Sequence, residues 1–266
     1  MIPNVLTIAG SDPSGGAGIQ ADLKTFSALG GYGMSVLTGL TAQNTIGVRS
    51  VHPVPASFVG EQLDAVFDDV RVDAVKIGML ATAEVIDVVA RTLTDRRPPF
   101  IVLDRVMVAK SGDRLLAADA VAHLRDRLLP IVDLVTPNLP EAADLLGEPE
   151  ATDESTMEAQ AKALAALGPA VLVKGGHLGG AESPDLLLER DATAPVRLTT
   201  GRVVTTSDHG TGCTLSSAIA ALRPRHDTLP DTVRAAKEYL TGALVAAGRL
   251  EVGHGHGPVH HFHAWW

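Results

Sequence analysis

The stretch "HGTGCTLSSAIAAL", residues 209–222, places a glycine-rich turn directly before a helical pattern. Gly210, Thr211, Gly212 and Cys213 come first, and apolar residues then recur at helical spacing. Glycines at a helix N-terminus leave several amide N–H groups exposed toward an anion, and the helix dipole adds a favourable potential. We therefore expect a phosphate group to bind here. The same field predicts a lowered pKa for the Cys213 thiol, with a buried inert cysteine as the alternative.

A second glycine-rich stretch, "GSDPSGGAG" at residues 10–18, follows the apolar run "NVLTIA". It is not a P-loop, because Ile19 and Gln20 follow Gly18 where that motif needs a lysine and a hydroxyl residue. The glycine spacing also fails the dinucleotide-binding fingerprint, which argues against a dinucleotide oxidoreductase. The loop therefore either lies beside another kind of ligand or forms a tight turn.

The elements that must position these loops alternate between short apolar strands and longer helical segments. The predicted strands are "NVLTIAG", "MSVLTGLTAQ", "AVKIGM", "FIVLD", "LVTPN" and "AVLVKGG", and the predicted helices cover residues 57–67, 83–93, 119–129, 140–146 and 156–167. This alternation, with strands apolar along their whole length, is typical of a parallel sheet covered by helices on both faces. We expect one α/β domain over residues 1–266.

Polar or distinctive residues follow the predicted strands at their carboxyl ends. They are Gly10, Gln43, Met79, Asp104, Asn138 and Lys174. Ligands bind outside the carboxyl ends of strands in open α/β sheets, so these residues together outline a site at one edge. Each of them taken singly is also compatible with a turn or helix-cap role.

Asp22 interrupts the apolar stripe of the first predicted helix. At about 100° per residue it lies on the same face as Phe26 and Leu29, so its carboxylate faces the core and needs a partner. Two interpretations stay open. Asp22 either contacts a ligand beside the glycine-rich loop, or it is held by the helix dipole and the local backbone.

Composition narrows the class of protein. Of 266 residues, 45% are hydrophobic but only 3% aromatic, so aliphatic side chains must fill the core. The balance of 22 basic and 31 acidic residues gives a net charge of −9, which argues against nucleic acid or an anionic membrane as partner. The single cysteine excludes an internal disulfide. With no secretory signal and no apolar run of about 18 residues, we expect a cytoplasmic protein.

The chain resembles the ribokinase superfamily, and within it the hydroxymethylpyrimidine/phosphomethylpyrimidine kinases of thiamine biosynthesis. The strings that carry the resemblance run from end to end: "LTIAGSDPSGGAGIQADLKTFSALG", "TAQNT", "KIGML", "VMVAKSGD", "TPNLPEA", "VKGGH", "HGTGCTLS" and "GHGPVHHFHAWW". The resemblance implies a three-layer α/β/α sandwich with a mainly parallel central sheet. It also implies an enzyme that uses ATP and Mg²⁺ to phosphorylate 4-amino-5-hydroxymethyl-2-methylpyrimidine and then its monophosphate, and it suggests a homodimer.

The resemblance also assigns roles on the substrate side. Gln43 would hydrogen-bond the aminopyrimidine, since a carboxamide offers a donor and an acceptor together. Gly10, Asp22 and Met79 would line the same pocket. Cys213 would stand where the sugar kinases of the superfamily carry an aspartate as base. We expect it to act as the general base of the first phosphorylation, with a place in the pocket wall as the alternative.

On the nucleotide side, the resemblance implies that Glu141 and Asp104 organise Mg²⁺ and its waters, as hard oxygen ligands should. Lys174 and Asn138 would bind ATP, and residues 210–213 would hold the transferring phosphoryl group. Two residues depart from the family pattern. Arg105 stands where proline or threonine is more frequent, which puts the metal role of Asp104 in doubt, and Asp208 stands where threonine is commoner.

The histidine-rich ending matches the family's own C-terminus, so we interpret it as part of the fold and not as a metal site or tag. Two rival functions remain open. A pyridoxal kinase would share the fold and the chemistry, with Gln43 favouring the aminopyrimidine. A non-catalytic pyrimidine sensor could retain the fold without the reaction.

Overall fold

The computed structural model describes residues 1–104 and 118–266. Arg105 and the "VMVAKSGD" string lie outside the described residues, so the prediction about Arg105 is not addressed by the structure. The described chain forms a sheet whose strand order is β10-β9-β8-β7-β6-β5-β1-β2. The bounds are β1 (Asn4–Ala9), β2 (Tyr32–Leu37), β5 (Ala74–Ile77), β6 (Ile101–Leu103), β7 (Leu134–Val135), β8 (Ala170–Lys174), β9 (Glu182–Leu188) and β10 (Val196–Gly201).

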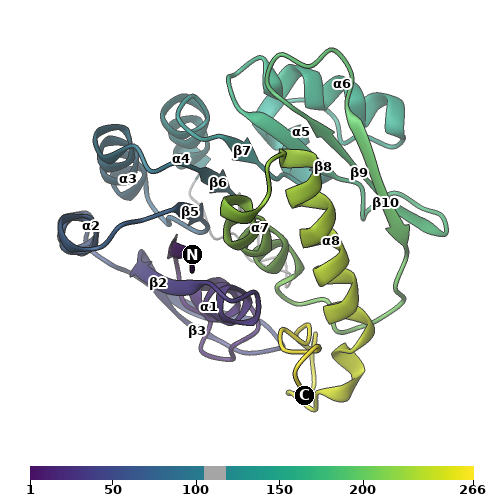
Figure 1. Cartoon of the computed structure of the whole chain (residues 1–266), viewed down its shortest axis with the longest axis horizontal. Coiled ribbons are helices and arrows are strands. Elements are labelled where there is room, and N and C mark those ends of the chain that lie inside the picture. The colour runs from purple at the N-terminus through teal and green to yellow at the C-terminus, as the bar shows by residue number, and fades with distance from the viewer. Residues whose placement is uncertain (105–117) are drawn as a thin grey trace.

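Strands β2, β1, β5, β6, β7 and β8 run parallel, whereas β9 and β10 add an antiparallel edge. A separate antiparallel pair, β3 (Gly39–Gln43) and β4 (Val48–Pro53), lies next to the β2 end of the sheet. The sheet is therefore mainly parallel, as expected from the strand–helix alternation (Figure 1).

Helices cover both faces of the sheet. One face carries α2 (Ala56–Asp69), α3 (Ala83–Arg96), α4 (Ala118–His123) with the π-helical turn η1 (Leu124–Leu128), α5 (Leu139–Leu146) and α6 (Glu154–Ala165). The other carries α1 (Gly18–Ala28), α7 (Thr211–Leu222) and α8 (Leu229–Val245). Short 3-10 turns follow α7 and α8, namely η2 (Arg223–Arg225) and η3 (Ala247–Arg249).

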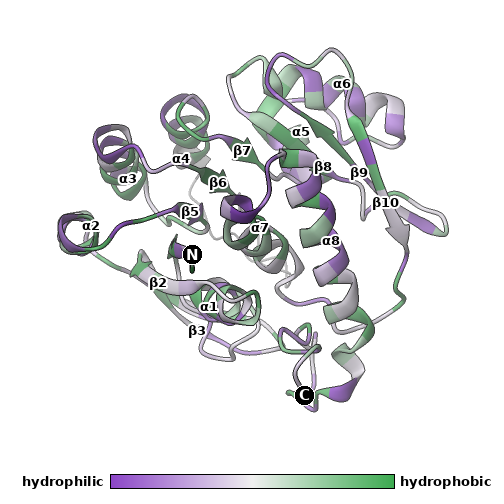
Figure 2. Cartoon of the chain, in the orientation of Figure 1, coloured by the Kyte–Doolittle hydropathy of each residue, from purple (hydrophilic) through white to green (hydrophobic). Residues whose placement is uncertain are grey.

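The two cores follow from the period-2 geometry of the strands. Along β8, Val171 and Val173 pack in the first core, and Leu172 between them packs in the second. Because both faces are covered, the central strands are mostly apolar, and Figure 2 shows β6 in hydrophobic colours while α6 and α8 also carry hydrophilic residues. The three-layer α/β/α arrangement is confirmed.

The prediction of one strand at "MSVLTGLTAQ" is wrong, because the segment divides at Thr38 into β2 and β3. The Thr38 hydroxyl donates to the Met79 carbonyl at 2.5 Å, and its backbone N–H donates to Ala9 at 3.1 Å. These bonds hold the chain where it leaves the main sheet. Strand β3 can then carry Gln43 toward the sheet's carboxyl edge.

The remaining predicted elements are found within a few residues of their expected positions, although the helix expected over 119–129 becomes α4 followed by η1. Strands β4, β9 and β10 and helix α8 were not predicted. None of the described helices is long and apolar enough to cross a membrane.

Candidate active site

A cavity of about 940 Å³ lies at the carboxyl edge of the parallel strands. Of the residues predicted for the site, those that line it are Gly10, Gln43, Met79, Asp104, Asn138, Glu141, Lys174, Gly210, Thr211, Gly212 and Cys213. The strand-end argument therefore brought together residues that lie far apart in the sequence. Asp22 is the one predicted residue that does not line the cavity.

The N-terminus of α7 opens into this cavity. Gly210 is its N-cap with φ of 80°, and a Cβ atom there would lie 1.9 Å from the Gly16 carbonyl oxygen, so only glycine fits. Gly210 has no side chain that could cap this helix, and no side-chain cap is found among the described residues. Its first turn therefore presents amide N–H groups to the cavity, as an anion site requires.

A pair of opposite charges faces the first turn of α7. Lys174 Nζ lies 3.3 Å from Asp104 Oδ1 and 4.0 Å from Glu141 Oε2. Burial alone would lower the pKa of Lys174, but the two carboxylates raise it above its usual value, which keeps the ammonium charged. A fixed cation thus stands beside the helix N-terminus.

Asp104 follows β6 and is only 2% exposed. Its Oδ1 accepts from Lys174 and, at 3.4 Å, from the Thr136 hydroxyl. Its Oδ2 is buried and has no hydrogen-bond partner among the described residues. A buried carboxylate oxygen of this kind is suited to a ligand that arrives from the cavity.

Glu141 and Asn138 form the capping box of α5. The Glu141 N–H donates to Asn138 Oδ1 at 2.9 Å, and the Asn138 N–H donates to Glu141 Oε2 at 2.8 Å. The helix-cap interpretation of Asn138 is therefore confirmed, and the cap also fixes the Glu141 carboxylate at the cavity wall. A role of Asn138 in binding ATP stays a prediction.

The expectation that Asp22 lines the substrate pocket is wrong. Its carboxylate is fully buried, and Lys76 Nζ lies 2.9 Å from both of its oxygens. Thr7 and Ser217 donate to it at 2.6 and 2.7 Å. The partner that a core-facing carboxylate needs is thus a lysine from β5, and neither a ligand nor the local backbone.

Lys76, which sequence reasoning missed, lines the cavity in place of Asp22. Burial would lower the pKa of this lysine, but the charge of Asp22 raises it above its usual value, which keeps the ammonium charged. Burial in turn raises the pKa of Asp22, and Lys76 with the two hydroxyl donors opposes that rise. The signal was present in the sequence, since "AVKIGM" places a lysine within an otherwise apolar strand.

The expectation of a lowered pKa at Cys213 is also wrong. The side chain is 8% exposed, and burial raises the pKa of its thiol to about 12. The positive charge of Lys76 opposes this rise but does not overcome it, and the carboxylates of Asp104 and Asp22 add to it. The thiol is therefore protonated at neutral pH.

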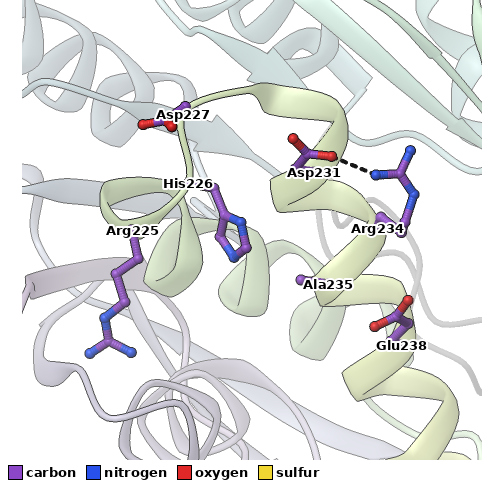
Figure 3. A pocket seen from close by; sticks show the side chains of 7 residues that line it. All are labelled: Arg225, His226, Asp227, Asp231, Arg234, Ala235 and Glu238. Atoms are coloured by element: carbon purple, nitrogen blue, oxygen red, sulfur yellow. Dashed lines mark hydrogen bonds and ion pairs between the residues drawn. The ribbon is translucent and has the colours of Figure 1, made fainter.

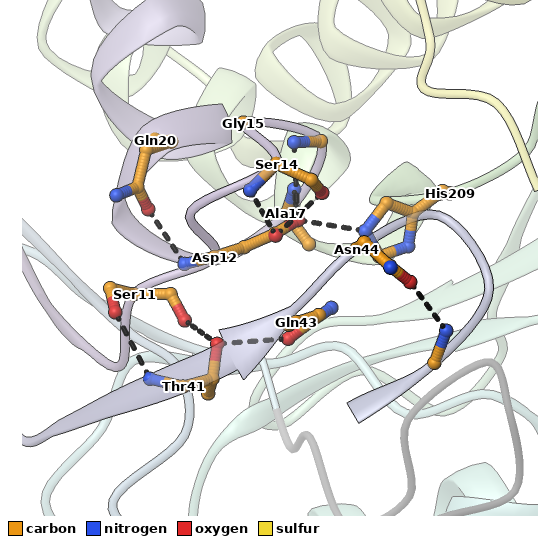
Figure 4. A network of polar contacts seen from close by, with 12 residues as sticks. Ser11, Asp12, Ser14, Gly15, Ala17, Gln20, Thr41, Gln43, Asn44 and His209 are labelled. Atoms are coloured by element: carbon orange, nitrogen blue, oxygen red, sulfur yellow. Dashed lines mark hydrogen bonds and ion pairs between the residues drawn. The ribbon is translucent and has the colours of Figure 1, made fainter. Parts of the chain in front are cut away.

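Gln43 ends β3 and lines the same cavity as the charged pair. Its Oε1 accepts from the Thr41 hydroxyl at 3.2 Å, and that hydroxyl also lies 2.8 Å from the Ser11 carbonyl oxygen (Figure 4). These contacts orient the carboxamide. Its Nε2 has no hydrogen-bond partner in the part of the chain that the structure describes, and it is available to a ligand.

The glycine-rich loop at residues 10–18 folds around its own aspartate. Asp12 is 1% exposed and accepts hydrogen bonds from the backbone of Ser14, Gly16 and Ala17 at 2.8–3.1 Å. His209 Nε2 also contacts it at 2.8 Å. The loop amides of Ser14, Gly16 and Ala17 are thus occupied by an internal carboxylate, which leaves the first turn of α7 as the candidate anion site. Sequence reasoning missed both Asp12 and His209.

A second hollow lies on the surface around η2 and the start of α8 (Figure 3). Asp231 and Arg234, which line it, form an exposed ion pair at 2.6 Å. No predicted site residue lines this hollow. The cavity at the strand ends is therefore the candidate active site.

The comparisons with known proteins agree with this geometry. The pyridoxal kinase of Bacillus subtilis, solved with ADP, superposes with a TM-score of 0.90 at 35% identity, covering 98% of both chains. The phosphomethylpyrimidine kinase of Clostridium difficile 630 gives 0.79 at 42% identity, over 92% of this chain and 100% of that one. The fold is therefore that of a small-molecule kinase.

The sequence comparisons identify one family among the proteins that share this fold. The sequence profile of phosphomethylpyrimidine kinase matches residues 12–260. The hydroxymethylpyrimidine/phosphomethylpyrimidine kinase of Escherichia coli K12 is 60% identical over 264 residues, which is 99% of this chain and 98% of that protein. The chain belongs to the phosphomethylpyrimidine kinase family.

Proposed function

We propose that this protein transfers the γ-phosphoryl group of ATP to 4-amino-5-hydroxymethyl-2-methylpyrimidine and then to the resulting monophosphate, within thiamine diphosphate biosynthesis. The observation that carries the proposal is a single cavity that joins an oriented carboxamide at Gln43 to the uncapped N-terminus of α7. The first can read a ring nitrogen beside an amino group, and the second can bind a phosphoryl group.

The protein's own groups supply positioning and charge for the transfer. The amides of residues 210–213 and the ammonium of Lys174 would stabilise negative charge on the transferring group, which is the main task in phosphoryl transfer. Gly10 and Met79 would close the acceptor side. A Cβ atom at Gly10 would lie 2.2 Å from the Met79 methyl carbon, so a larger residue there would displace the end of the Met79 side chain.

Asp104 and Glu141 fit a Mg²⁺ ion that accompanies the nucleotide. The fit rests on the buried Asp104 Oδ2, which has no hydrogen-bond partner among the described residues, and on the hard carboxylate character of both groups. The ion would neutralise charge on the phosphates. The ammonium of Lys174, 3.3 Å from Asp104 and 4.0 Å from Glu141, offsets part of the repulsion between the two carboxylates.

The test is mass spectrometry of the products formed from the pyrimidine and MgATP. The proposal expects both the monophosphate and the diphosphate. Pyridoxal is the alternative acceptor, favoured by the close superposition with the Bacillus subtilis pyridoxal kinase. A higher kcat/KM for pyridoxal than for the pyrimidine would overturn the assignment. The absence of product from both acceptors would instead support a non-catalytic pyrimidine sensor.

We also propose that residues 1–266 act as one kinase domain in a cytoplasmic homodimer. The composition supports the compartment, because the single cysteine of the chain needs no oxidising environment. Light scattering of the purified protein would measure the oligomeric state, and a monomer mass at working concentration would contradict the dimer.

A further inference from the structure

The carboxylate of Asp12 holds the glycine-rich loop together through hydrogen bonds to both of its oxygens. Its Oδ1 accepts from the backbone N–H and the hydroxyl of Ser14 at 2.9 and 2.7 Å. Its Oδ2 accepts from the N–H groups of Gly16 and Ala17 at 3.1 and 2.8 Å, directly before α1 begins. Figure 4 shows this carboxylate enclosed by the loop, with His209 reaching it from a different part of the chain.

The bond between Asp12 and His209 has a defined direction. Burial would raise the pKa of Asp12, but hydrogen bonds from His209 and Ser14 lower it to about 2. Asp12 is therefore an anion at neutral pH and can only accept, so His209 Nε2 is the donor over the 2.8 Å contact. The contact is buried, which protects it from competition by solvent.

His209 directly precedes the N-cap of α7 and is fixed from a second side. Its backbone N–H donates to Gly257 in the C-terminal segment at 3.0 Å. The neighbouring Gly255 and His256 donate to Thr45 at 3.2 and 2.9 Å, just after the strand that carries Gln43. Figure 1 shows this segment between β3 and the end of α8.

The two loops meet without room for any side chain at their glycines. A Cβ atom at Gly16 would lie 2.4 Å from His209 Cδ2, and one at Gly210 would lie 1.9 Å from the Gly16 carbonyl oxygen. The Asp12–His209 bond thus closes an interface in which the glycine-rich loop and the α7 N-cap touch backbone to backbone. Because His209 directly precedes the α7 N-cap, a displacement of His209 would be passed on to the first turn of α7.

We propose that Asp12 and His209 are positioning residues for phosphoryl transfer. The pair holds the N-terminus of α7 in register with the loop that begins at Gly10, and it does so without taking part in proton or phosphoryl transfer. Because the loop fixes the acceptor pocket and α7 fixes the phosphoryl group, the pair sets the distance between the two reactants.

The test compares two variants that differ by one methylene group. His209→Gln keeps an amide donor long enough to reach Asp12, whereas His209→Asn is too short. Turnover is measured as ADP release with whichever acceptor the wild type phosphorylates, so the result does not depend on the substrate assignment. His226→Asn is the matched control, since His226 lines only the surface hollow.

We expect His209→Asn to lower kcat by about 10- to 100-fold, the scale of a displaced catalytic group, and to leave the acceptor KM within about twofold. His209→Gln should recover most of the lost kcat, and His226→Asn should match the wild type. Asp12→Asn should also cost less kcat in the His209→Asn background than in the wild type, because both changes break the same bond.

Three results would overturn the proposal. One is an unchanged kcat in His209→Asn. Another is an equal kcat loss in His209→Gln and His209→Asn while both proteins keep the wild-type circular dichroism spectrum. The third is full additivity of the Asp12 and His209 changes. If Asp12→Asn does not fold, the two His209 variants decide the matter alone.

Discussion

Lys174 Nζ lies 3.3 Å from Asp104 Oδ1, and the first turn of α7 adjoins both side chains: a Cβ atom at Gly212 would sit 3.4 Å from that nitrogen and 3.5 Å from each carboxylate oxygen. A half-buried cation, a buried carboxylate and a helix N-terminus thus share one small volume. The ammonium and the helix N-terminus attract anions, and the carboxylate suits a metal ion. Together the three groups suit a nucleotide phosphate with its cation.

The contact at Gly212 predicts a large loss of activity on substitution. Gly212→Val should push Lys174 and Asp104 away from the α7 amides and lower kcat by about 100-fold or more, which is the scale for losing preorganised donors. Gly248→Val is the matched control, because a Cβ atom there meets nothing within 4 Å. Steady-state kinetics with saturating ATP measure the effect, and near-normal turnover in Gly212→Val would place phosphoryl stabilisation elsewhere.

The buried pair of Lys76 and Asp22 predicts a loss of stability. Lys76→Met leaves the Asp22 carboxylate without its cation in the core, which should reduce the free energy of unfolding by about 3–5 kcal/mol. Adding Asp22→Asn to that variant should recover part of the loss, since the buried charge is then removed.

Urea unfolding followed by circular dichroism measures both Lys76 variants. Lys162→Met is the control, because Lys162 pairs with Glu158 at 2.7 Å on an exposed helix face and should cost less than about 1 kcal/mol. If Lys76→Met lowers the free energy of unfolding no more than this control does, the Lys76–Asp22 pair does not stabilise the fold.

Gln43 predicts a change in substrate binding. Gln43→Leu removes the donor and acceptor offered to the aminopyrimidine and leaves its polar edge unpaired, which should cost about 1–3 kcal/mol of binding. We expect KM for the pyrimidine to rise while KM for ATP stays unchanged. An unaltered pyrimidine KM in the folded variant would show that another group reads the ring.

Local patterns in the sequence explain why the core of the fold could be predicted. Strands covered on both faces must be mostly apolar, and β1 and β8 are of this kind. Strand β4 has mostly exposed residues, and β9 contains Pro184 and Asp185, so neither shows that pattern. Strands β4 and β9 were not predicted for this reason.

The candidate site likewise contains residues that the sequence could predict and contacts that it could not. Glycines before a helix and polar residues after strands are local signals, and they led to residues that line one cavity. Contacts between distant residues give no such signal. Asp22 meets Lys76 across 54 positions and Asp12 meets His209 across 197, so a single sequence shows neither pair.

The burial of Cys213 predicts how the two phosphorylation steps respond to its loss. The first step needs a hydroxymethyl group to lose its proton, for which a positioned base typically contributes about 10²–10⁴-fold. The second step uses a phosphate monoester, largely dianionic at neutral pH because its second pKa is about 6, and it needs no base. A thiolate base at Cys213 would therefore make the first step the more sensitive one.

With its pKa raised to about 12, the Cys213 thiol is protonated at neutral pH and cannot accept a proton. We therefore expect Cys213→Ala to lower kcat of both steps by similar factors, because it opens a gap in the cavity wall, and Cys213→Ser to retain most activity in both. Separate assays with the pyrimidine and with its monophosphate measure each kcat. A loss in the first step about tenfold or more greater than in the second would instead identify Cys213 as the base, with ligand binding providing the deprotonation that the free protein lacks.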